Sequence, residues 1–217
     1  MHTQFQQHGL NVGPHRGPGD AEADGHGRGA RASHQQFQAL PLALGEKGSE
    51  PAALFTSFGA RPAAAVEQDV RNYKAWYGVT SILLDQAASD AGKLGYYRRL
   101  AGFIRSADPG GAVWLNPGIY PDQRYMTIAS VVMAFEGPYS SYSRLRVPAW
   151  VGRYPAAKFA HTIYATPGSR LASAISLARS RHAGWVFVTD RSGANPYDGL
   201  PSFWSREQAA IAQGCHG

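Results

Sequence analysis

The chain has 217 residues, of which 44% are hydrophobic and 17% are charged, and its formal net charge is +6. This length and composition are typical of one globular domain with a buried core, and no run of about 18 apolar residues predicts a membrane-spanning helix. A basic surface attracts anions, but the Lys and Arg residues form no run of five or more, so a nucleic-acid binder is weakly supported. The single cysteine, Cys215, excludes an internal disulfide.

Residues 1–54 differ in composition from the rest of the chain. They hold five of the eight histidines but only two of the 25 aromatic residues. Such a segment cannot bury enough apolar surface to offset chain entropy, so we expect it to be disordered. Its histidines have no compact metal-ligand spacing, and the start of the chain lacks the apolar region of a signal peptide.

The remaining residues, 55–217, alternate between helical and strand patterns. The first helix is predicted over residues 61–77, with Pro62 at its start and Gly78 after its end. Apolar spacing predicts three further helices, over residues 90–106, 169–182 and 205–213. Short apolar runs predict strands at residues 81–85, 112–116, 130–136, 159–164 and 185–190, and a sixth at 54–58.

This alternation predicts an α/β fold with parallel strands joined by helical crossovers. Near-continuous apolar strands indicate a sheet that is buried on both faces. A closed barrel needs eight strands and typically about 250 residues. We therefore expect a (β/α)8 TIM-type barrel that lacks its first two or three βα units.

Polar side chains end four of the predicted strands: Asp85, Asn116, Glu136 and Asp190. In barrels of this kind, the carboxyl ends of the strands form the active-site face. Asp85 and Glu136 could supply the two carboxyl groups that glycoside hydrolysis requires. The alternative is that these acids cap a helix or pair with a basic residue. Asp190 precedes a loop, so a turn or capping role is favoured for it.

Other side chains could contact a sugar. A histidine within a strand, such as His161, is more often a hydrogen-bonded core residue than a catalytic one. Aromatic residues follow several strands, where they could stack on sugar rings or simply pack at the barrel rim: Tyr120, Tyr139, Tyr142, Tyr197 and Trp204. The turn-rich loop 195–198 is a candidate binding element. No nucleotide-binding glycine motif, serine-hydrolase elbow or zinc spacing is present.

Seven stretches, taken in order, resemble spherulation-specific family 4, the spherulin-4-like proteins. They are Thr-Ser-Phe-Gly-Ala-Arg (56–61), Tyr-Lys-Ala-Trp-Tyr-Gly-Val (73–79), Ile-Leu-Leu-Asp (82–85), Leu-Asn-Pro-Gly (115–118), Phe-Glu-Gly-Pro-Tyr (135–139), Val-Thr-Asp (188–190) and Asn-Pro-Tyr-Asp-Gly-Leu-Pro (195–201). No single stretch is decisive, and the resemblance depends on their order and spacing along the chain. It implies a secreted (β/α)-barrel glycoside hydrolase that cuts α-1,4-linked galactosamine or N-acetylgalactosamine exopolysaccharide.

The resemblance also implies site residues. An Asp-Glu pair after one strand of the family corresponds to Asp85-Gln86, and a later Phe-Glu-Gly corresponds to Phe135-Glu136-Gly137. Asp85 and Glu136 match the family pattern, whereas Gln86 keeps the shape of a glutamate but not its charge. The first strands of the family, with their Asn-Pro-Gly-Pro-Gly segment, have no counterpart in residues 1–54. We therefore interpret that segment as a reading from a wrong frame or a wrong start.

The leading hypothesis is a monomeric extracellular glycoside hydrolase that has a polysaccharide substrate and needs no metal or other cofactor, with Asp85 and Glu136 as catalytic residues. The residues expected to bind substrate are Gln86, Asn116, Tyr139, His161, Asp190, Asn195 and Tyr197. The alternative is a non-catalytic carbohydrate-binding or cell-surface protein on the same scaffold, which the glutamine and the missing strands favour. A nucleic-acid binder rests on net charge alone.

Overall fold

The computed structural model describes residues 51–79 and 81–212. The predictions for residues 1–50, including the expected disorder and the histidine spacing, lie outside the described residues. Among the helices that are described, none is both long enough and apolar enough to cross a membrane.

Six strands and five α-helices make up the described fold. The strands are β1 (Ala52–Phe55), β2 (Ile82–Asp85), β3 (Val113–Leu115), β4 (Val131–Pro138), β5 (Phe159–Tyr164) and β6 (Trp185–Val188). The helices are α2 (Ala63–Tyr77), α3 (Leu94–Ala107), α4 (Tyr139–Tyr142), α5 (Leu171–Ser180) and α6 (Trp204–Ala212). Short 3₁₀ turns join several of these elements.

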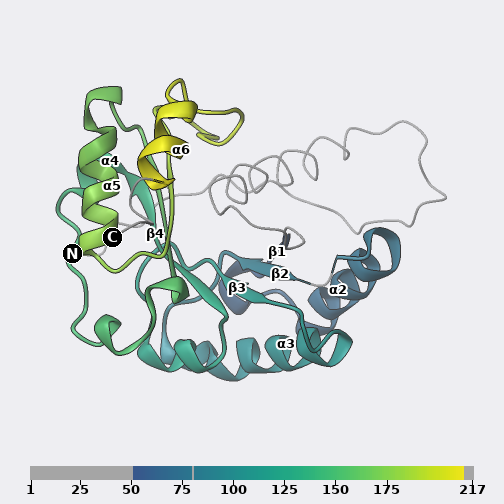
Figure 1. The fold of residues 1–217 in the computed structure, drawn as a ribbon. Helices are drawn as coiled ribbons and strands as arrows, with labels where there is room; N and C mark the ends of the chain where they lie inside the picture. Colours follow the sequence, from purple (N-terminus) through teal and green to yellow (C-terminus); the bar gives the residue numbers. More distant parts are fainter. Residues whose placement is uncertain (1–50, 80, 213–217) are drawn as a thin grey trace.

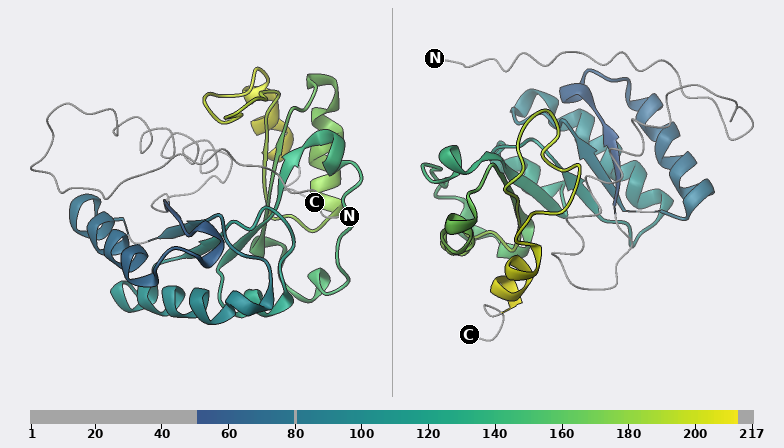
Figure 2. Two further views of the ribbon diagram at one scale, coloured as in Figure 1. Left: turned by 180° about the vertical axis from the view of Figure 1, so that it is seen from behind. Right: turned by 90° about the horizontal axis from the view of Figure 1, so that it is seen from above.

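The strands form one parallel sheet in the order β1-β2-β3-β4-β5-β6 (Figure 1). A doubly wound sheet reverses its strand order at a switch point, whereas sequential order is the pattern of a (β/α) barrel. Right-handed crossovers then place successive helices on the same side of the sheet. Figure 2 shows α2 and α3 along one end of this curved sheet and α5 at the other. The predicted α/β barrel-type fold is confirmed, as six strands of an open sheet within the described residues.

The residues predicted to begin and end the first helix do so. α2 begins directly after Pro62, and it ends before Gly78, whose φ of 65° is easily adopted by glycine. α3 buries one face, which includes Leu94, Tyr97 and Leu100. This face contributes to the apolar layer between the helices and the outer side of strands β1 to β4.

The first strand begins and ends earlier than predicted. We expected it at residues 54–58, but β1 begins at Ala52 and ends at Phe55. Ser57 and Phe58 have φ angles of 49° and 53°, in the left-handed region, where an extended strand cannot continue. The side chain of Thr56, just after the strand, is completely buried.

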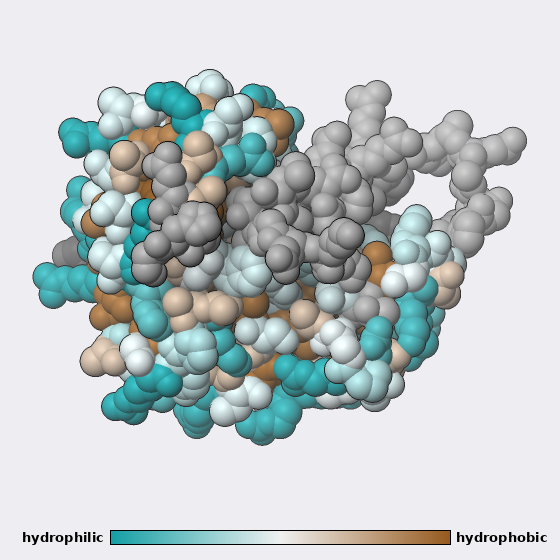
Figure 3. Space-filling view, viewed as in Figure 1, coloured by the Kyte–Doolittle hydropathy of each residue, from teal (hydrophilic) through white to brown (hydrophobic). Residues whose placement is uncertain are grey.

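The two faces of the sheet have separate apolar clusters. Toward the helices, α2 and α3 pack on β1 to β4, and α5 and α6 pack on β5 and β6. The inner face carries a third cluster, which includes Leu83, Trp114, Met133 and Phe187. The surface seen in Figure 3 is a mixture of hydrophilic and hydrophobic side chains without one continuous apolar area over the elements in colour. The buried apolar surface therefore lies between the layers, as the near-continuous apolar strands predict.

Candidate active site

Three strand-end side chains meet at the carboxyl edge of the sheet. Asp85 ends β2, Asn116 follows β3, and Glu136 lies near the end of β4. The Nδ2 atom of Asn116 donates hydrogen bonds to Oδ1 of Asp85 at 2.8 Å and to Oε2 of Glu136 at 2.7 Å. The Oδ1 atom of Asn116 accepts the backbone N–H of Gly118 at 3.0 Å, which fixes the orientation of the amide. Three of the four polar strand ends in the sequence prediction therefore meet, whereas the fourth, Asp190, is hydrogen-bonded to Ser202.

A β-bulge in β4 delivers Glu136 to this cluster. Met133 pairs with Ala160, but Phe135, two positions later, pairs with the next residue, His161. The extra residue, Ala134, shifts the alternation of side chains, as a bulge does. Because of this shift Phe135 packs on the helix side of the sheet, while Glu136 reaches the amide of Asn116. Regular alternation from Met133 would have placed Glu136 on the helix side.

Tyr197 completes the hydrogen bonding of Glu136. Its hydroxyl donates to Oε1 of Glu136 at 2.8 Å, so the two oxygens of that carboxyl each receive a side-chain donor. Tyr197 is only 4% exposed, and its backbone N–H donates to the side chain of Asn195 at 3.1 Å. Burial raises the pKa of Tyr197, and the nearby carboxylate of Glu136 raises it further, so the hydroxyl stays protonated and remains a donor. Asn195 therefore helps to fix the backbone of the loop from which Tyr197 reaches Glu136.

Asp85 is nearly buried beside a second carboxyl. It is 8% exposed. Burial, followed by repulsion from Glu136, raises the pKa of Asp85 to about 6, against the lowering effect of hydrogen bonds from the Gln86 backbone and Asn116. The carbonyl oxygen of Asp85 accepts the Thr56 hydroxyl at 2.9 Å. That hydroxyl also lies 2.8 Å from the Tyr97 hydroxyl, so the end of β2 is held by buried groups next to β1 and on α3.

Gln86 follows Asp85 in an unusual backbone conformation. Its φ is 48°, and few residues other than glycine adopt such an angle. Its carbonyl oxygen accepts the backbone N–H of Phe58 at 2.8 Å and the hydroxyl of Thr56 at 2.9 Å. The loop after β1 therefore holds Gln86 next to Asp85.

His161 lies outside the carboxylate cluster. It is completely buried on β5, with Nδ1 2.8 Å from the Tyr142 hydroxyl and Nε2 3.1 Å from the Tyr120 hydroxyl. Burial, with a smaller contribution from Arg181, lowers the pKa of His161 to about 3, so the ring is neutral at ordinary pH. These contacts are those of a hydrogen-bonded core histidine, and its expected contact with substrate remains a prediction.

Asp190 and Tyr139 are also separate from the bridged pair. Asp190 accepts hydrogen bonds from the backbone N–H of Ser202 at 3.1 Å and from its hydroxyl, which anchors the loop after β6. Tyr139 begins α4 and packs, partly buried, on the cluster beneath α5. Their roles in binding remain predictions.

Sequence reasoning missed one aromatic residue close to the pair. Tyr164 ends β5, and burial raises its pKa, with a further contribution from Glu136. Its place at the end of the predicted strand 159–164 could have identified it, because the ends of parallel strands lie at the same edge as Asp85. Trp204, by contrast, begins α6 and packs against Phe187, with ring centroids 6.3 Å apart.

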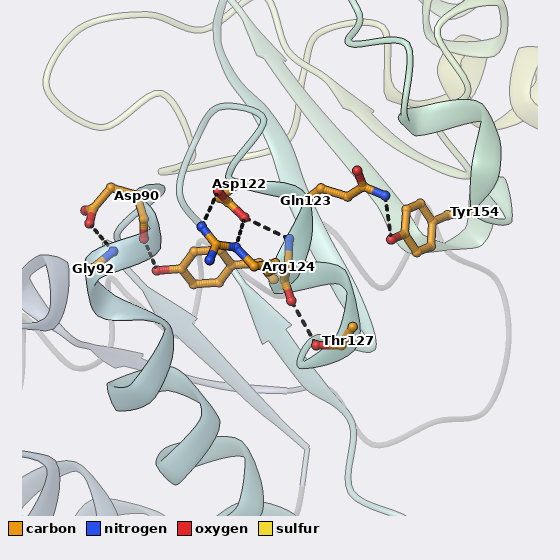
Figure 4. A network of polar contacts seen from close by, with 8 residues as sticks. Asp90, Gly92, Asp122, Gln123, Arg124, Thr127 and Tyr154 are labelled. Atoms are coloured by element: carbon orange, nitrogen blue, oxygen red, sulfur yellow. Dashed lines mark hydrogen bonds and ion pairs between the residues drawn. The ribbon is translucent and has the colours of Figure 1, made fainter.

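A polar network stabilises the loops on the α3 side of the site (Figure 4). Both carboxylate oxygens of Asp122 accept from the guanidinium of Arg124, at 2.9 and 3.0 Å. The Tyr125 hydroxyl donates to the carbonyl of Asp90 at 2.8 Å, which ties the loop after β3 to the loop after β2. Over residues 51–79 and 81–212, no cluster of three or more His, Cys, Asp or Glu side chains could hold a metal ion.

Comparisons with known proteins agree with this fold. The family model for spherulation-specific family 4 matches residues 54–211. Spherulin-4 of Physarum polycephalum is 32% identical over 167 residues, which cover 72% of this chain and 50% of that protein, so the chain spans about half the length of this relative. The crystal structure of Aspergillus clavatus Sph3 in complex with GalNAc has a TM-score of 0.69 and 22% identity, covering 82% of this chain and 78% of that one. The family match extends over most of the chain and includes every strand end of the site, so this chain belongs to spherulation-specific family 4.

Proposed function

We propose that this chain hydrolyses glycosidic bonds of an amino-sugar polysaccharide, with Asp85 and Glu136 as the two carboxyl groups of the reaction. The observation that carries this proposal is the amide of Asn116, which donates to both carboxyls at 2.8 and 2.7 Å. Glycoside hydrolysis needs one carboxyl to protonate the leaving oxygen and another to attack the anomeric carbon or activate a water. A side chain that binds both holds them in a fixed relation before substrate arrives.

The spacing of the pair favours retention of configuration. One nitrogen of Asn116 lies 2.8 Å from an oxygen of Asp85 and 2.7 Å from an oxygen of Glu136, so these two oxygens are separated by no more than the sum of the two distances. Retaining enzymes have carboxyl groups about 5–5.5 Å apart, whereas inverting enzymes need about 6.5–9.5 Å. In the retaining reaction, one carboxylate attacks the anomeric carbon while the other carboxyl gives its proton to the leaving oxygen. Water then cleaves the glycosyl ester and returns a proton to the second carboxyl.

The proton that this reaction needs is available in mildly acidic solution. Burial, followed by repulsion from Glu136, raises the pKa of Asp85 to about 6. Below about this pH Asp85 holds a proton that it can give to the leaving oxygen. We expect the rate to fall as the pH rises above about 6, because that proton is then lost.

The proposed substrate is α-1,4-linked galactosamine or N-acetylgalactosamine exopolysaccharide. Two considerations support it: the resemblance of the sequence motifs to enzymes of this type, and the likeness in fold to Sph3, whose crystal structure contains GalNAc. Such a polymer lies outside cells, so the proposal includes an extracellular location.

The second candidate function is binding of the same polysaccharide without cleavage. The observation that favours it is Gln86, an amide at the position where the family resemblance implies a glutamate. Gln86 lies directly after Asp85, and its φ of 48° shows that the backbone there is held in a specific conformation. If a charge at this position is essential, the site binds sugar but does not cut it.

The test is release of reducing ends from an α-1,4-linked galactosamine/N-acetylgalactosamine polymer. We expect the parent to release reducing ends, and the Asp85→Asn and Glu136→Gln variants to be at least about 100-fold slower, because each lacks one of the two required carboxyls. Glu67→Gln is the matched control, since Glu67 lies on α2 in an ion pair with Arg99. Gln86→Glu should release reducing ends faster than the parent if the missing charge limits the reaction.

Azide distinguishes the two roles within the pair. In the variant that lacks the nucleophile, azide should displace the leaving group directly and give the β-glycosyl azide, by one inversion from the α-linked substrate. In the variant that lacks the acid, azide should attack the glycosyl ester and give the α-glycosyl azide, by two inversions. A folded parent that binds the polymer but releases no reducing ends, with or without Gln86→Glu, would support the binding function instead. A folded parent that neither binds nor cleaves the polymer would refute both.

A further inference from the structure

We propose that the ring of Phe55 is a stacking surface for the sugar unit that binds next to Asp85, an inference that rests on the proposed function. Phe55 is the last residue of β1 and pairs in register with Asp85, the last residue of β2. Side chains of paired residues leave a parallel sheet on the same face, and neighbouring strands lie about 4.8 Å apart. Phe55 is therefore the β1 neighbour of the proposed catalytic carboxyl.

The exposure of Phe55 distinguishes it from the rest of the inner face. It is 43% exposed, whereas on the same face of the neighbouring strand β2 Leu83 is 1% exposed and Asp85 is 8% exposed. A large apolar side chain on a strand normally buries most of its surface. An exposed phenyl ring next to the strand-end carboxyl of Asp85 matches the usual lining of a ligand site, in which apolar rings surround a few convergent polar groups.

The backbone around Phe55 is held from several directions. The N–H of Thr56 donates to the carbonyl of Asp85 at 2.9 Å, and the Thr56 hydroxyl donates to the same oxygen at 2.9 Å. Arg61 donates from Nη1 to the carbonyl of Phe55 at 3.2 Å. A side chain that extends from so restrained a backbone loses little entropy when a ligand packs against it.

The chemistry of the ring selects a particular face of the sugar. A galactose-type pyranose has an axial hydroxyl at C4, so the C–H groups at C3, C4 and C5 form one apolar surface. Aromatic rings pack favourably against such apolar surfaces, while the polar edges of the sugar stay free for the carboxyls and the amide of Asn116. Phe55 therefore orients the ring whose glycosidic bond lies at Asp85, and it acts in positioning and not in the chemical step.

Kinetics of reducing-end release test this inference. We expect Phe55→Ala to raise KM by about three- to ten-fold with kcat nearly unchanged, because the contact is made equally in the ground and transition states. Phe55→Trp, which keeps an aromatic face, should restore the parent KM. The matched control is Trp76→Ala, because Trp76 is a similarly exposed aromatic residue, at 46%, and lies near the end of the helix α2 and not on a strand end.

Binding measured without turnover separates this inference from the proposed function. In a Glu136→Gln background, calorimetry with a galactosamine-type oligosaccharide should show about three- to ten-fold weaker affinity when Phe55 is also alanine. If that affinity changes by less than about two-fold in folded protein, the Phe55 inference is wrong and the proposed function is untouched. If neither background binds and the parent releases nothing, the proposed function fails and takes this inference with it.

Discussion

Replacing Gly137 with alanine should damage both stability and the site, because Gly137 makes room for the bulge that turns Glu136 inward. A Cβ atom at residue 137 would lie 2.8 Å from Cζ of Phe135 and 3.3 and 3.4 Å from two other ring atoms. The ring cannot swing aside, because Phe135 is 7% exposed and lies 4.8 Å from the Tyr142 ring between centroids. Either the ring or the β4 backbone must move.

The expected magnitude follows from two opposing terms. Forcing an extra methyl group into a packed core costs about 1–3 kcal/mol, and the reduced entropy of the unfolded chain returns about 0.4–1 kcal/mol. We therefore expect Gly137→Ala to lower the free energy of unfolding by about 1–2 kcal/mol. The matched control is Gly102→Ala, because Gly102 lies within α3 and a Cβ there has no neighbour within 4 Å. That variant should gain about 0.5–1 kcal/mol.

Urea unfolding and reducing-end release measure the two consequences separately. A shift of the bulge moves Glu136 away from Asn116, so the rate for Gly137→Ala should fall by about ten-fold or more even in urea-free buffer, where the protein is folded. Gly102→Ala should keep the parent rate. A Gly137→Ala variant as stable and as active as the parent would refute the assignment of Gly137 to the bulge.

Three further predictions concern single side chains. Burial raises the pKa of Glu207 from 4.5 to about 8, so the folded chain keeps a proton that the unfolded chain releases, and stability should fall as pH rises from about 4.5 to about 8. Glu207→Gln retains an acceptor for the Val188 N–H, and it should make the free energy of unfolding depend less on pH, by up to about 1 kcal/mol per pH unit. Urea titrations at about pH 5 and pH 8 measure this dependence, and the same dependence in the variant as in the parent would contradict the prediction. Tyr197→Phe removes a 2.8 Å hydrogen bond to Glu136 and should lower kcat by about ten-fold with KM kept, and a loss confined to KM would argue against this role. Gly184→Ala would put a Cβ 2.6 Å from a backbone carbonyl oxygen, so we expect a loss of about 2 kcal/mol or more, seen as a lower Tm.

Much of the fold was predictable because its signals are local. The Pro62 start and Gly78 end of α2 depend on the backbone preferences of those residues alone. The apolar runs that became β2 and β5 are buried throughout except for Tyr164, the last residue of β5. Parallel pairing then follows from the helices between them, and it brings strand-end polar groups to one edge.

The predictions that needed correction or were missed depend on contacts between distant residues. Nothing in the run 130–136 marks the bulge after Met133, since it is defined by the pairing of β4 with β5. The end of β1 was misplaced because Phe58 adopts its left-handed angle while its N–H is bound to the carbonyl of Gln86, which lies beyond α2 and β2 in the sequence. The sequence could not show that both ring nitrogens of His161 are hydrogen-bonded in the core. The tyrosine hydroxyls that bond them come from α4 and from the loop after β3.

The position of the site within the sheet bears on how many strands it needs. Asp85, Asn116 and Glu136 are supplied by β2, β3 and β4, and each of these strands is paired with a neighbour on both sides. Among the strands of residues 51–79 and 81–212, β1 and β6 are the outermost, and at β6 the backbone N–H of Val188 donates to the buried carboxyl of Glu207. The bridged carboxyl pair is therefore held by the central strands of this sheet. We therefore expect the two carboxyls to keep their spacing without contacts from strands beyond these six.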